Sequence, residues 1–404
     1  MEVEHPPPNA RGVFKSLIQN PRFIISAFFL SMTFFTFGYD GAVISGILAM
    51  DPFIQQVGTG DADGVRFLTA TDMSVMTAIP STGCLLGLPL AAFLGDRIGR
   101  KKTLVIGCFI SCVGAAVQTS SFSMAQFTIG RWLAYISIFI FIVMGSTFLA
   151  EISPQNIRGA IVGLSIVLVD TAGVLSAGIN WALSTNSGPI SYRLPLGVQI
   201  ALPIIIGAGL IFIDDSPTFY LTKSRDEDAM RSLRRIRGGY SEEEIQAEFA
   251  ALNAQADLRE SEDNVPWSDM FRGTNLRRTL LALSIGNMQQ LSGISFATNY
   301  ATIFLATVNN SVSPFLLTMV IQILALAGAL VGIFLVDRVG RRPLALATFL
   351  VVFIIDLIIA ELDVMFEARV PAREFKDYVC NVSVENYLSE TKVAASRLEE
   401  VEHP

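Results

Sequence analysis

The sequence predicts an all-α membrane protein. Apolar residues make up 51% of its 404 residues and charged residues only 16%, which is not the balance of a soluble domain. The apolar residues are gathered in runs of about 20 residues that are nearly free of charge, a length that crosses a hydrocarbon core of about 30 Å. Because lipid offers the backbone no hydrogen bonds, such runs must be helices.

Six apolar runs predict an amino-terminal six-helix bundle over residues 23–213. The expected spans are 23–47, 74–94, 103–119, 127–148, 160–183 and 194–213. A polar tail over 1–22 precedes them, and it lacks the cleavage site of a signal peptide. The first span is therefore its own membrane signal.

A hydrophilic central loop is expected over 214–278, because it is too rich in Arg, Glu and Lys to cross a bilayer. Its stretches 226–237 and 241–259 have the residue spacing of amphipathic helices. The loop separates the first bundle from a second group of apolar runs.

The second group predicts a short carboxyl-terminal bundle over 279–360, followed by a polar tail over 361–404. Its expected spans are 279–305, 314–336 and a weaker candidate over 344–360, which Asp356 interrupts. Eight or nine spans are expected in all.

The distribution of basic residues predicts the orientation. Lys and Arg gather in the loops after spans two, four, six and eight, whereas the alternate loops carry only Arg66 and Arg193. Because basic residues in short loops stay on the cytoplasmic side, the amino terminus and the central loop are expected there.

The residue types that most enzymes need are scarce. The only histidines, His5 and His403, stand at the two ends of the chain, and the four cysteines form no CxxC pair. Neither a phosphate-binding loop nor a Ser/His/Asp set is recognisable. The sequence therefore predicts no enzyme, cofactor, metal or nucleic-acid partner.

A repeated loop is the strongest specific signal. One copy follows span two and the other follows span eight, at matching positions in the two halves. The residues concerned are Gly95, Asp96, Arg97, Gly99 and Arg100 in the first copy, and Asp337, Arg338, Gly340 and Arg341 in the second. Glycine permits a sharp turn, and Asp and Arg at helix ends can lock one packing of the bundle. The alternative is that these arginines only enforce topology.

With these motifs the chain resembles the sugar porter branch of the major facilitator superfamily, most closely its fungal members. The resemblance is carried by Phe37-Gly38-Tyr39-Asp40-Gly41, both repeated loops, Gly130-Arg131, Glu151-Ile152-Ser153-Pro154, Ile157-Arg158-Gly159, Asp215-Ser216-Pro217 and Gln289-Gln290-Leu291-Ser292-Gly293-Ile294. It implies the major facilitator fold, with two six-helix bundles around a central sugar site and transport by alternating access. Glu151 and Arg158 would join the repeated loops in gating.

The resemblance also implies proton coupling by Asp40 and Arg131. Asp40 stands inside an apolar run, where a carboxylate is costly and needs a partner. In proton-linked sugar symporters the matching acid carries the proton, and the matching arginine pairs with it once it is deprotonated. A structural salt bridge at a helix end is the alternative.

The implied sugar contacts are Gln289 and Gln290, because an amide can donate to or accept from a hydroxyl. Helix packing is the alternative for both. Ser295 replaces a family asparagine and Tyr300 stands beside Asn299, so the site is expected to be reshaped. Asp170 is an acid one turn from Val167, where the family has a sugar-binding glutamine. It is either a second titratable group, a substrate contact or a bond between helices.

The end of the chain departs most from the family pattern, because spans ten to twelve are not recognisable. The sequence therefore predicts proton-coupled transport of a hexose-like sugar, with two alternatives: an inactive truncated isoform or a sugar sensor that does not transport. The expected partners are a small sugar, protons and the lipid bilayer. A monomer in the plasma membrane is expected.

Overall fold

The computed structural model describes residues 21–62, 65–154, 158–262, 268, 271–291, 293–308, 312–340 and 342–352. The chain divides into two compact units, Met1–Ile333 and Phe334–Pro404. The polar tails expected over 1–22 and 361–404 lie outside the described residues, apart from the residues at 21 and 22.

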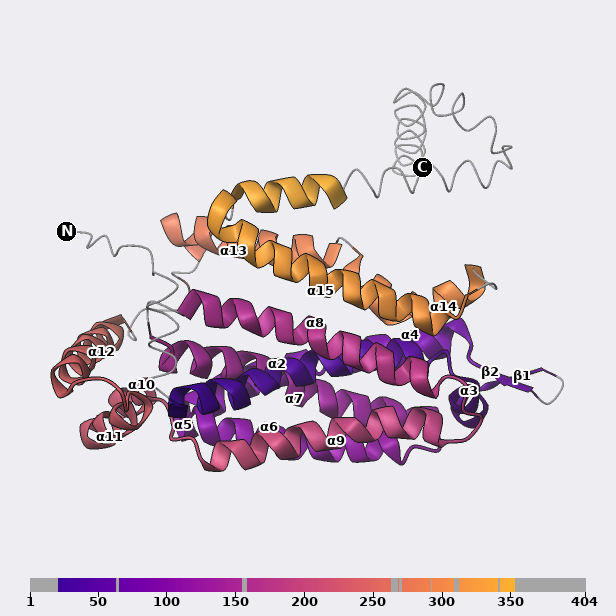
Figure 1. Ribbon diagram of the computed structural model, residues 1–404, viewed down its shortest axis with the longest axis horizontal. Helices are drawn as coiled ribbons and strands as arrows, with labels where there is room; N and C mark the ends of the chain where they lie inside the picture. Colours follow the sequence, from indigo (N-terminus) through magenta and orange to yellow (C-terminus); the bar gives the residue numbers. More distant parts are fainter. Residues whose placement is uncertain are drawn as a thin grey trace, which may run out of the picture. The chain divides into compact units, whose positions relative to one another are not determined.

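Seven helices of the described chain are long and apolar enough to cross a membrane. They are α2 (Pro21–Ile47), α4 with α5 (Ala70–Ser81 and Cys84–Ile98), α6 (Arg100–Thr119), α7 (Met124–Ile152), α8 (Arg158–Leu183), α9 (Ile190–Ile211) and α15 (Pro314–Val339). Each agrees with a predicted span to within four residues at either end, and α9 ends two residues before the predicted 213. The all-α membrane fold expected from composition is confirmed (Figure 1).

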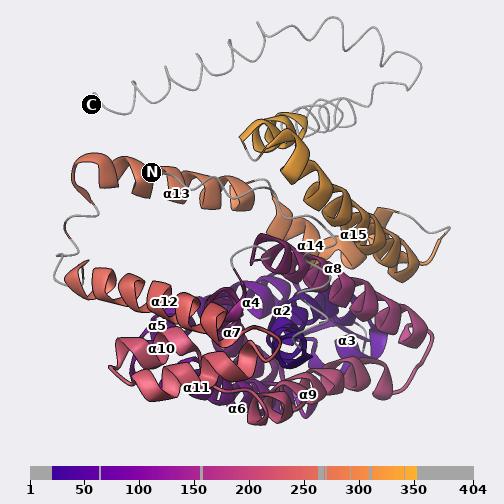
Figure 2. The ribbon, with the colours of Figure 1, turned by 60° about the vertical axis from the view of Figure 1, so that its left-hand side comes forward.

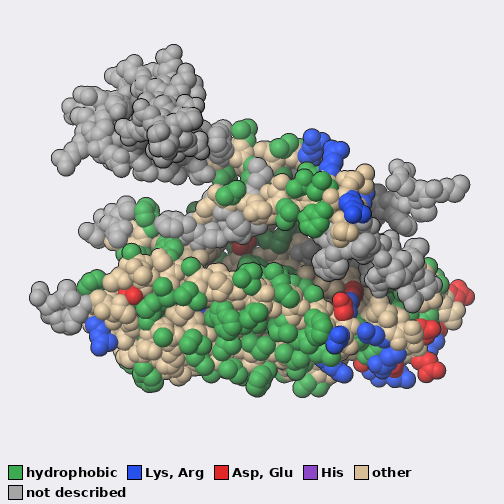
Figure 3. Space-filling view, turned by 180° about the vertical axis from the view of Figure 1, so that it is seen from behind, with side chains coloured by type: hydrophobic (Ala, Val, Ile, Leu, Met, Phe, Trp, Pro, Cys, Tyr) green, Lys and Arg blue, Asp and Glu red, His purple; other side chains and the backbone are tan. Residues whose placement is uncertain are grey.

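Helix α7 contributes many of the buried residues of the amino-terminal bundle, where it packs against α2, α5 and α6. One apolar core surrounds Phe141, Phe148 and Leu210, and a second surrounds Ile47, Phe53 and Phe127. Large apolar side chains are exposed along the flank of the bundle, while charged side chains gather at one end (Figure 3). This is the surface of a bundle that faces lipid along its sides and water at its end.

The predicted second span is two helices, since α4 ends at Ser81 and α5 begins at Cys84. Pro80 lies in the last turn of α4. Proline lacks the N–H that would continue the hydrogen-bond ladder. After it the backbone N–H groups of Thr82 and Gly83 bond the carbonyl oxygens of Ile79 and Pro80, three residues back, and the α-helix is interrupted. Hydropathy alone reads the two helices as one run.

A short helix and a hairpin connect the first two spans, and neither is predicted from the sequence. Helix α3 (Asp51–Val57) is followed by the antiparallel strands β1 (Gly60–Ala62) and β2 (Val65–Phe67), with Gly60 paired to Phe67. Helix α4 then begins with a capping box between Thr69 and Asp72.

Three helices of the central loop lie together across one end of the amino-terminal bundle (Figures 1 and 2). They are α10 (Pro217–Thr222), α11 (Asp226–Ile236) and α12 (Glu242–Glu262). The sequence predicts the second and third of these to within three residues at each end, and α10 is not predicted.

The predicted seventh span is also two helices, α13 (Gly273–Leu291) and α14 (Ile294–Val308). Gly293, between them, has a φ of 75°, a left-handed conformation that glycine adopts without strain. Helix α14 packs against α2.

The second compact unit holds the end of α15 and a helix over Arg342–Val352. This helix covers the start of the weak ninth span predicted over 344–360. The remainder of that prediction lies outside the described residues.

Candidate functional site

Asp40 is buried inside the amino-terminal bundle, with 4% of its surface exposed. Its Oδ1 accepts a hydrogen bond of 2.7 Å from Nε2 of Gln199 on α9. Its Oδ2 has no hydrogen-bond partner among the described groups. A carboxylate in apolar surroundings is costly unless it is paired or protonated.

Arg131 of α7 is fully buried near this carboxyl. Its positive charge acts on Asp40, but no salt bridge joins the two residues, which both belong to the described chain. Its Nη2 donates to the hydroxyl of Tyr135 at 3.5 Å, and the guanidinium lies 5.3 Å from the centre of that ring. Nε and Nη1 of Arg131 find no described partner. The predicted pair is therefore close but unbonded in this structure.

Sequence reasoning missed Gln199, which holds the carboxyl of Asp40. The signal was available, because Gln199 is a polar side chain in the middle of the otherwise apolar stretch Leu194–Leu202. It is 4% exposed, and a buried amide in a membrane helix needs a partner.

Asp170 is half-buried in α8, one turn beyond Val167. No hydrogen bond or ion pair to it is formed by any residue that the structure describes. Of the other predicted sugar contacts, Gln289 and Gln290 belong to α13 and Ser295 belongs to α14. The side chains of these three lie outside the described part.

Tyr300 of α14 donates to or accepts from the hydroxyl of Thr77 on α4 at 2.7 Å. A second set of hydroxyls joins the same two halves. Ser45 of α2 lies 2.9 Å from the hydroxyl of Thr302 on α14, which lies 2.9 Å from that of Thr318 on α15. All three of these residues are buried. The two halves are thus bonded at the end of α2 opposite to α10, α11 and α12.

The first repeated loop turns at Gly99, whose φ is 101°. Arg100 follows and is buried, with Nη1 bonded to the carbonyl oxygen of Gly95 at 3.0 Å and Nη2 to Glu151 at 3.1 Å. The side chain of Asp96 is 80% exposed and 3.5 Å from Arg100. Arg97 stacks on Phe93 at 4.2 Å. The loop therefore ties α5 and α6 to the end of α7.

Asp215 binds the backbone of this loop, a contact that the sequence motif does not predict. Its Oδ1 accepts from the backbone N–H groups of Arg100 at 3.1 Å and Lys101 at 3.2 Å, at the start of α6. A Cβ at Gly99 would collide with the same carboxyl. Burial raises the pKa of Asp215 above its usual range, and the backbone donors oppose that rise.

The second repeated loop has its own turn at Gly340, with a φ of 88°. Arg338 is exposed at the end of α15. The side chains of Asp337, Arg341 and Arg158 lie outside the described residues. The two loops therefore share a glycine turn with a positive φ.

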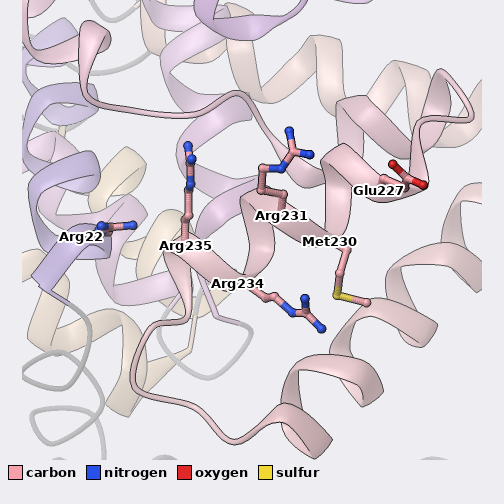
Figure 4. A pocket seen from close by; sticks show the side chains of 6 residues that line it. All are labelled: Arg22, Glu227, Met230, Arg231, Arg234 and Arg235. Carbon is pink, nitrogen blue, oxygen red and sulfur yellow. The ribbon is translucent and has the colours of Figure 1, made fainter.

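A cavity of about 460 Å³ lies where α11 meets the start of α2 (Figure 4). It is lined by Arg22, Glu227, Met230, Arg231, Arg234 and Arg235. Three of these arginines are paired, with Asp228, Glu242 and Asp214. Arg22 and Asp40 are separated by about 27 Å along α2 at 1.5 Å per residue, so this cavity is separate from the buried carboxyl. The described residues contain no group of three metal-binding side chains.

A family model for sugar (and other) transporters matches residues 26–382. Among curated relatives, major facilitator-type transporter ecdD of Aspergillus rugulosus is 29% identical over 85% of this chain and 63% of its own length. Low-affinity glucose transporter HXT4 of Saccharomyces cerevisiae is 29% identical over 76% of this chain and 54% of its own. High glucose sensor RGT2 of the same species is 28% identical over 85% of this chain and 45% of its own. The chain thus spans between about half and two thirds of the length of these relatives.

Solved structures share the fold. The proton:xylose symporter XylE bound to 6-bromo-6-deoxy-D-glucose superposes with a TM-score of 0.67 at 19% identity, covering 80% of this chain and 70% of that one. A partially occluded inward-open conformation of XylE from E. coli superposes with a TM-score of 0.65 at 17% identity, covering 80% and 75%.

Proposed function

The chain belongs to the sugar (and other) transporter family of the major facilitator superfamily, and from this premise we propose that it moves a hexose-like sugar across a membrane together with a proton. Relatives that are named as glucose transporters support a hexose-like sugar as the substrate. The observation that supports proton coupling is the buried carboxyl of Asp40. One of its oxygens accepts a hydrogen bond, and the other has no described partner.

The polar cluster around Asp40 suits a group that alternates between charged and neutral forms. When Asp40 is deprotonated, the positive charge of Arg131 and the amide of Gln199 stabilise the carboxylate. When it is protonated, Gln199 still provides an oxygen that can accept the new O–H. The Oε1 of Gln199 has no described partner, so it is available for that bond.

The broken seventh span supports a solute site between the halves. A break in a membrane helix frees backbone N–H and C=O groups, which is tolerated where they line a cavity. The break between α13 and α14 is described at Gly293, shortly after the predicted contacts Gln289 and Gln290. The surface is hollowed between these helices and the amino-terminal bundle (Figure 3).

Alternating access requires the two halves to separate at one end while they close at the other. The hydroxyl bonds through Thr77 and Ser45 close the end away from α10 to α12. With the central loop on the expected cytoplasmic side, this state is closed to the outside. The repeated loops and their partners Glu151 and Asp215 are proposed to govern the opposite end.

The test is uptake of labelled glucose into vesicles that contain the purified chain under an imposed pH gradient. We expect accumulation above equilibrium for the unchanged chain. Asp40→Asn should abolish accumulation and keep exchange of labelled for unlabelled glucose, because only proton movement is removed. Asp51→Asn, on the short helix outside the spans, is the control. Accumulation by Asp40→Asn equal to that of the unchanged chain would exclude proton coupling at this residue.

Sugar sensing is a second candidate, because one relative is named as a high glucose sensor. A sensor would bind glucose and carry none. Saturable glucose binding by the purified chain without uptake or exchange in the same vesicles would favour sensing. The absence of both binding and exchange would favour an inactive chain.

A further inference from the structure

Asp170 is a carboxyl inside a membrane helix without a partner in the described protein. It stands near the middle of α8, half-buried. Asp40, in contrast, has the bond from Gln199 and the nearby charge of Arg131. An ionisable side chain at membrane depth normally faces the interior of a bundle and is paired there. Something outside the described chain must therefore satisfy Asp170.

The side of α8 that carries Asp170 faces the region between the two halves. Gly173 lies one turn along α8 and shares a face with Asp170. A Cβ at Gly173 would meet Oε1 of Gln322 on α15 at 3.1 Å and Cβ of Ala42 on α2 at 3.8 Å.

Of the helices near Asp170, only α7 carries a cation in its middle, Arg131, and that guanidinium acts on Asp40 and Tyr135 and forms no ion pair with Asp170. The other neighbouring helices carry basic residues only near their ends, at Arg22 in α2, Arg193 in α9 and Arg338 in α15, and α14 carries none. When Asp170 is ionised, a solute between the two halves is therefore the source of a positive charge to pair with it. A neutral hydroxyl in the same place would form a hydrogen bond and leave the negative charge of Asp170 uncompensated.

We infer that Asp170 selects solutes that carry an ammonium group beside their hydroxyls, such as amino sugars, over the neutral sugars of the same shape. The inference rests on the proposed sugar site and specifies its charge. An ammonium group donates hydrogen bonds to a carboxylate and neutralises it, and such charge-assisted bonds are about twice as strong as neutral ones.

The experiment compares D-glucose with D-glucosamine, which replaces one hydroxyl by an amine, on the purified full chain in lipid nanodiscs. Binding is measured by calorimetry at a pH where the amine is protonated. We expect glucosamine to bind on the order of ten-fold more tightly than glucose. Asp170→Asn should remove this preference and change glucose affinity by less than about three-fold, since the amide keeps the shape and removes the charge.

Two further variants guard the result against a folding defect. Asp170→Glu keeps the charge and should retain part of the preference. Asp72→Asn changes a carboxyl that is already bonded to Thr59 and Thr69, and the preference should be unaffected. Raising the pH until the amine is neutral should remove the preference of the unchanged chain.

Each other outcome has a definite meaning. Equal binding of the two sugars, or a preference that survives Asp170→Asn, would overturn the inference and leave the sugar site standing. An equal loss of affinity for both sugars in Asp170→Asn would also overturn it, because the residue would then contact both sugars without distinguishing their charge. If neither sugar binds to the unchanged chain, the proposed sugar site fails together with the inference.

Discussion

Arg237 is a buried cation whose partners come from three separate parts of the fold. It forms a two-point pair with Glu248 of α12 at 2.9 and 2.8 Å, and its Nη1 donates to the carbonyl oxygen of Ile152, the last residue of α7, at 2.9 Å. Its guanidinium also lies 5.9 Å from the ring of Phe23 at the start of α2. It therefore fastens the loop helices to the bundle.

Replacing Arg237 by methionine should destabilise the chain by about 2–3 kcal/mol, because it removes charge-assisted bonds from a site that excludes most water. Thermal unfolding of the purified chain, followed by tryptophan fluorescence, measures the loss. The matched control is Arg234→Met, since Arg234 also pairs with a glutamate of α12 but is 52% exposed. An exposed pair contributes less than about 1 kcal/mol. Equal effects of the two changes would contradict the role given to burial.

At the scale of single residues, the sequence identifies which side chains are unusual and not which ones meet. Asp40 is recognisable because it is an acid in an apolar run. Its partner Gln199 lies 159 positions away, and their contact depends on the depth at which α2 and α9 pack. Hydropathy does not determine that depth to within one turn, so the bond could not be predicted.

At the scale of elements, helices α2 and α8 approach closely at Gly38. A Cβ on this residue would collide with the backbone of Val169 on α8. Gly41, one turn further along α2, has nothing within 4 Å of the same position. Of the two glycines in this motif, only Gly38 is therefore kept small by its neighbours.

Gly38→Ala should destabilise the bundle by about 1–3 kcal/mol, because the added methyl must push α8 away. Gly41→Ala is the matched control, and it should be neutral or stabilise α2 by up to about 1 kcal/mol, because alanine loses less backbone freedom than glycine. Both are compared by the thermal midpoint of the purified variants and by the amount of folded protein in membranes. An unchanged midpoint in Gly38→Ala would show that α8 moves aside freely.

The sequence predicts the long helices well because each is a continuous apolar run. It does not predict the breaks at 82–83 and at Gly293, since an apolar run has the same hydropathy whether or not its backbone bends. Pro80 and Gly293 are local signals for the breaks. Helix α3 and the hairpin after it are short and mixed in polarity, so they carry no periodic signal.

At the scale of the whole molecule, the sequence predicts the family fold, because the paired loops at Gly99 and Gly340 mark two related halves. It does not predict which end of the molecule is closed. That depends on hydroxyls such as Ser45 and Thr302, which are common in membrane helices and bond their own helix equally well. Only their contact across the halves distinguishes them.

The hydroxyl bonds between the halves should bias the equilibrium between the two access states. A hydrogen bond between membrane helices contributes about 0.6 kcal/mol on average. Ser45 forms two, with the hydroxyl and the backbone N–H of Thr302, and Thr77 forms one, so losing all three removes roughly 1.8 kcal/mol. The double change Ser45→Ala with Thr77→Val should then raise the ratio of the open to the closed state by about twenty-fold. The bonds concerned are those to Thr302 and Tyr300.

Fluorescence energy transfer between labels at positions 51 and 312 measures this ratio, in a chain whose four cysteines have been replaced by serine. Both positions are exposed, one on α3 and the other just before α15, so their separation should increase when the halves part at this end. Ser74→Ala is the control, because the hydroxyl of Ser74 bonds only the carbonyl oxygen of Ala70 on its own helix. The double change and the control could instead give the same distribution of energy-transfer efficiency. In that case the hydroxyls do not hold this end closed, and packing of apolar side chains along α2 and α14 determines the state of the molecule.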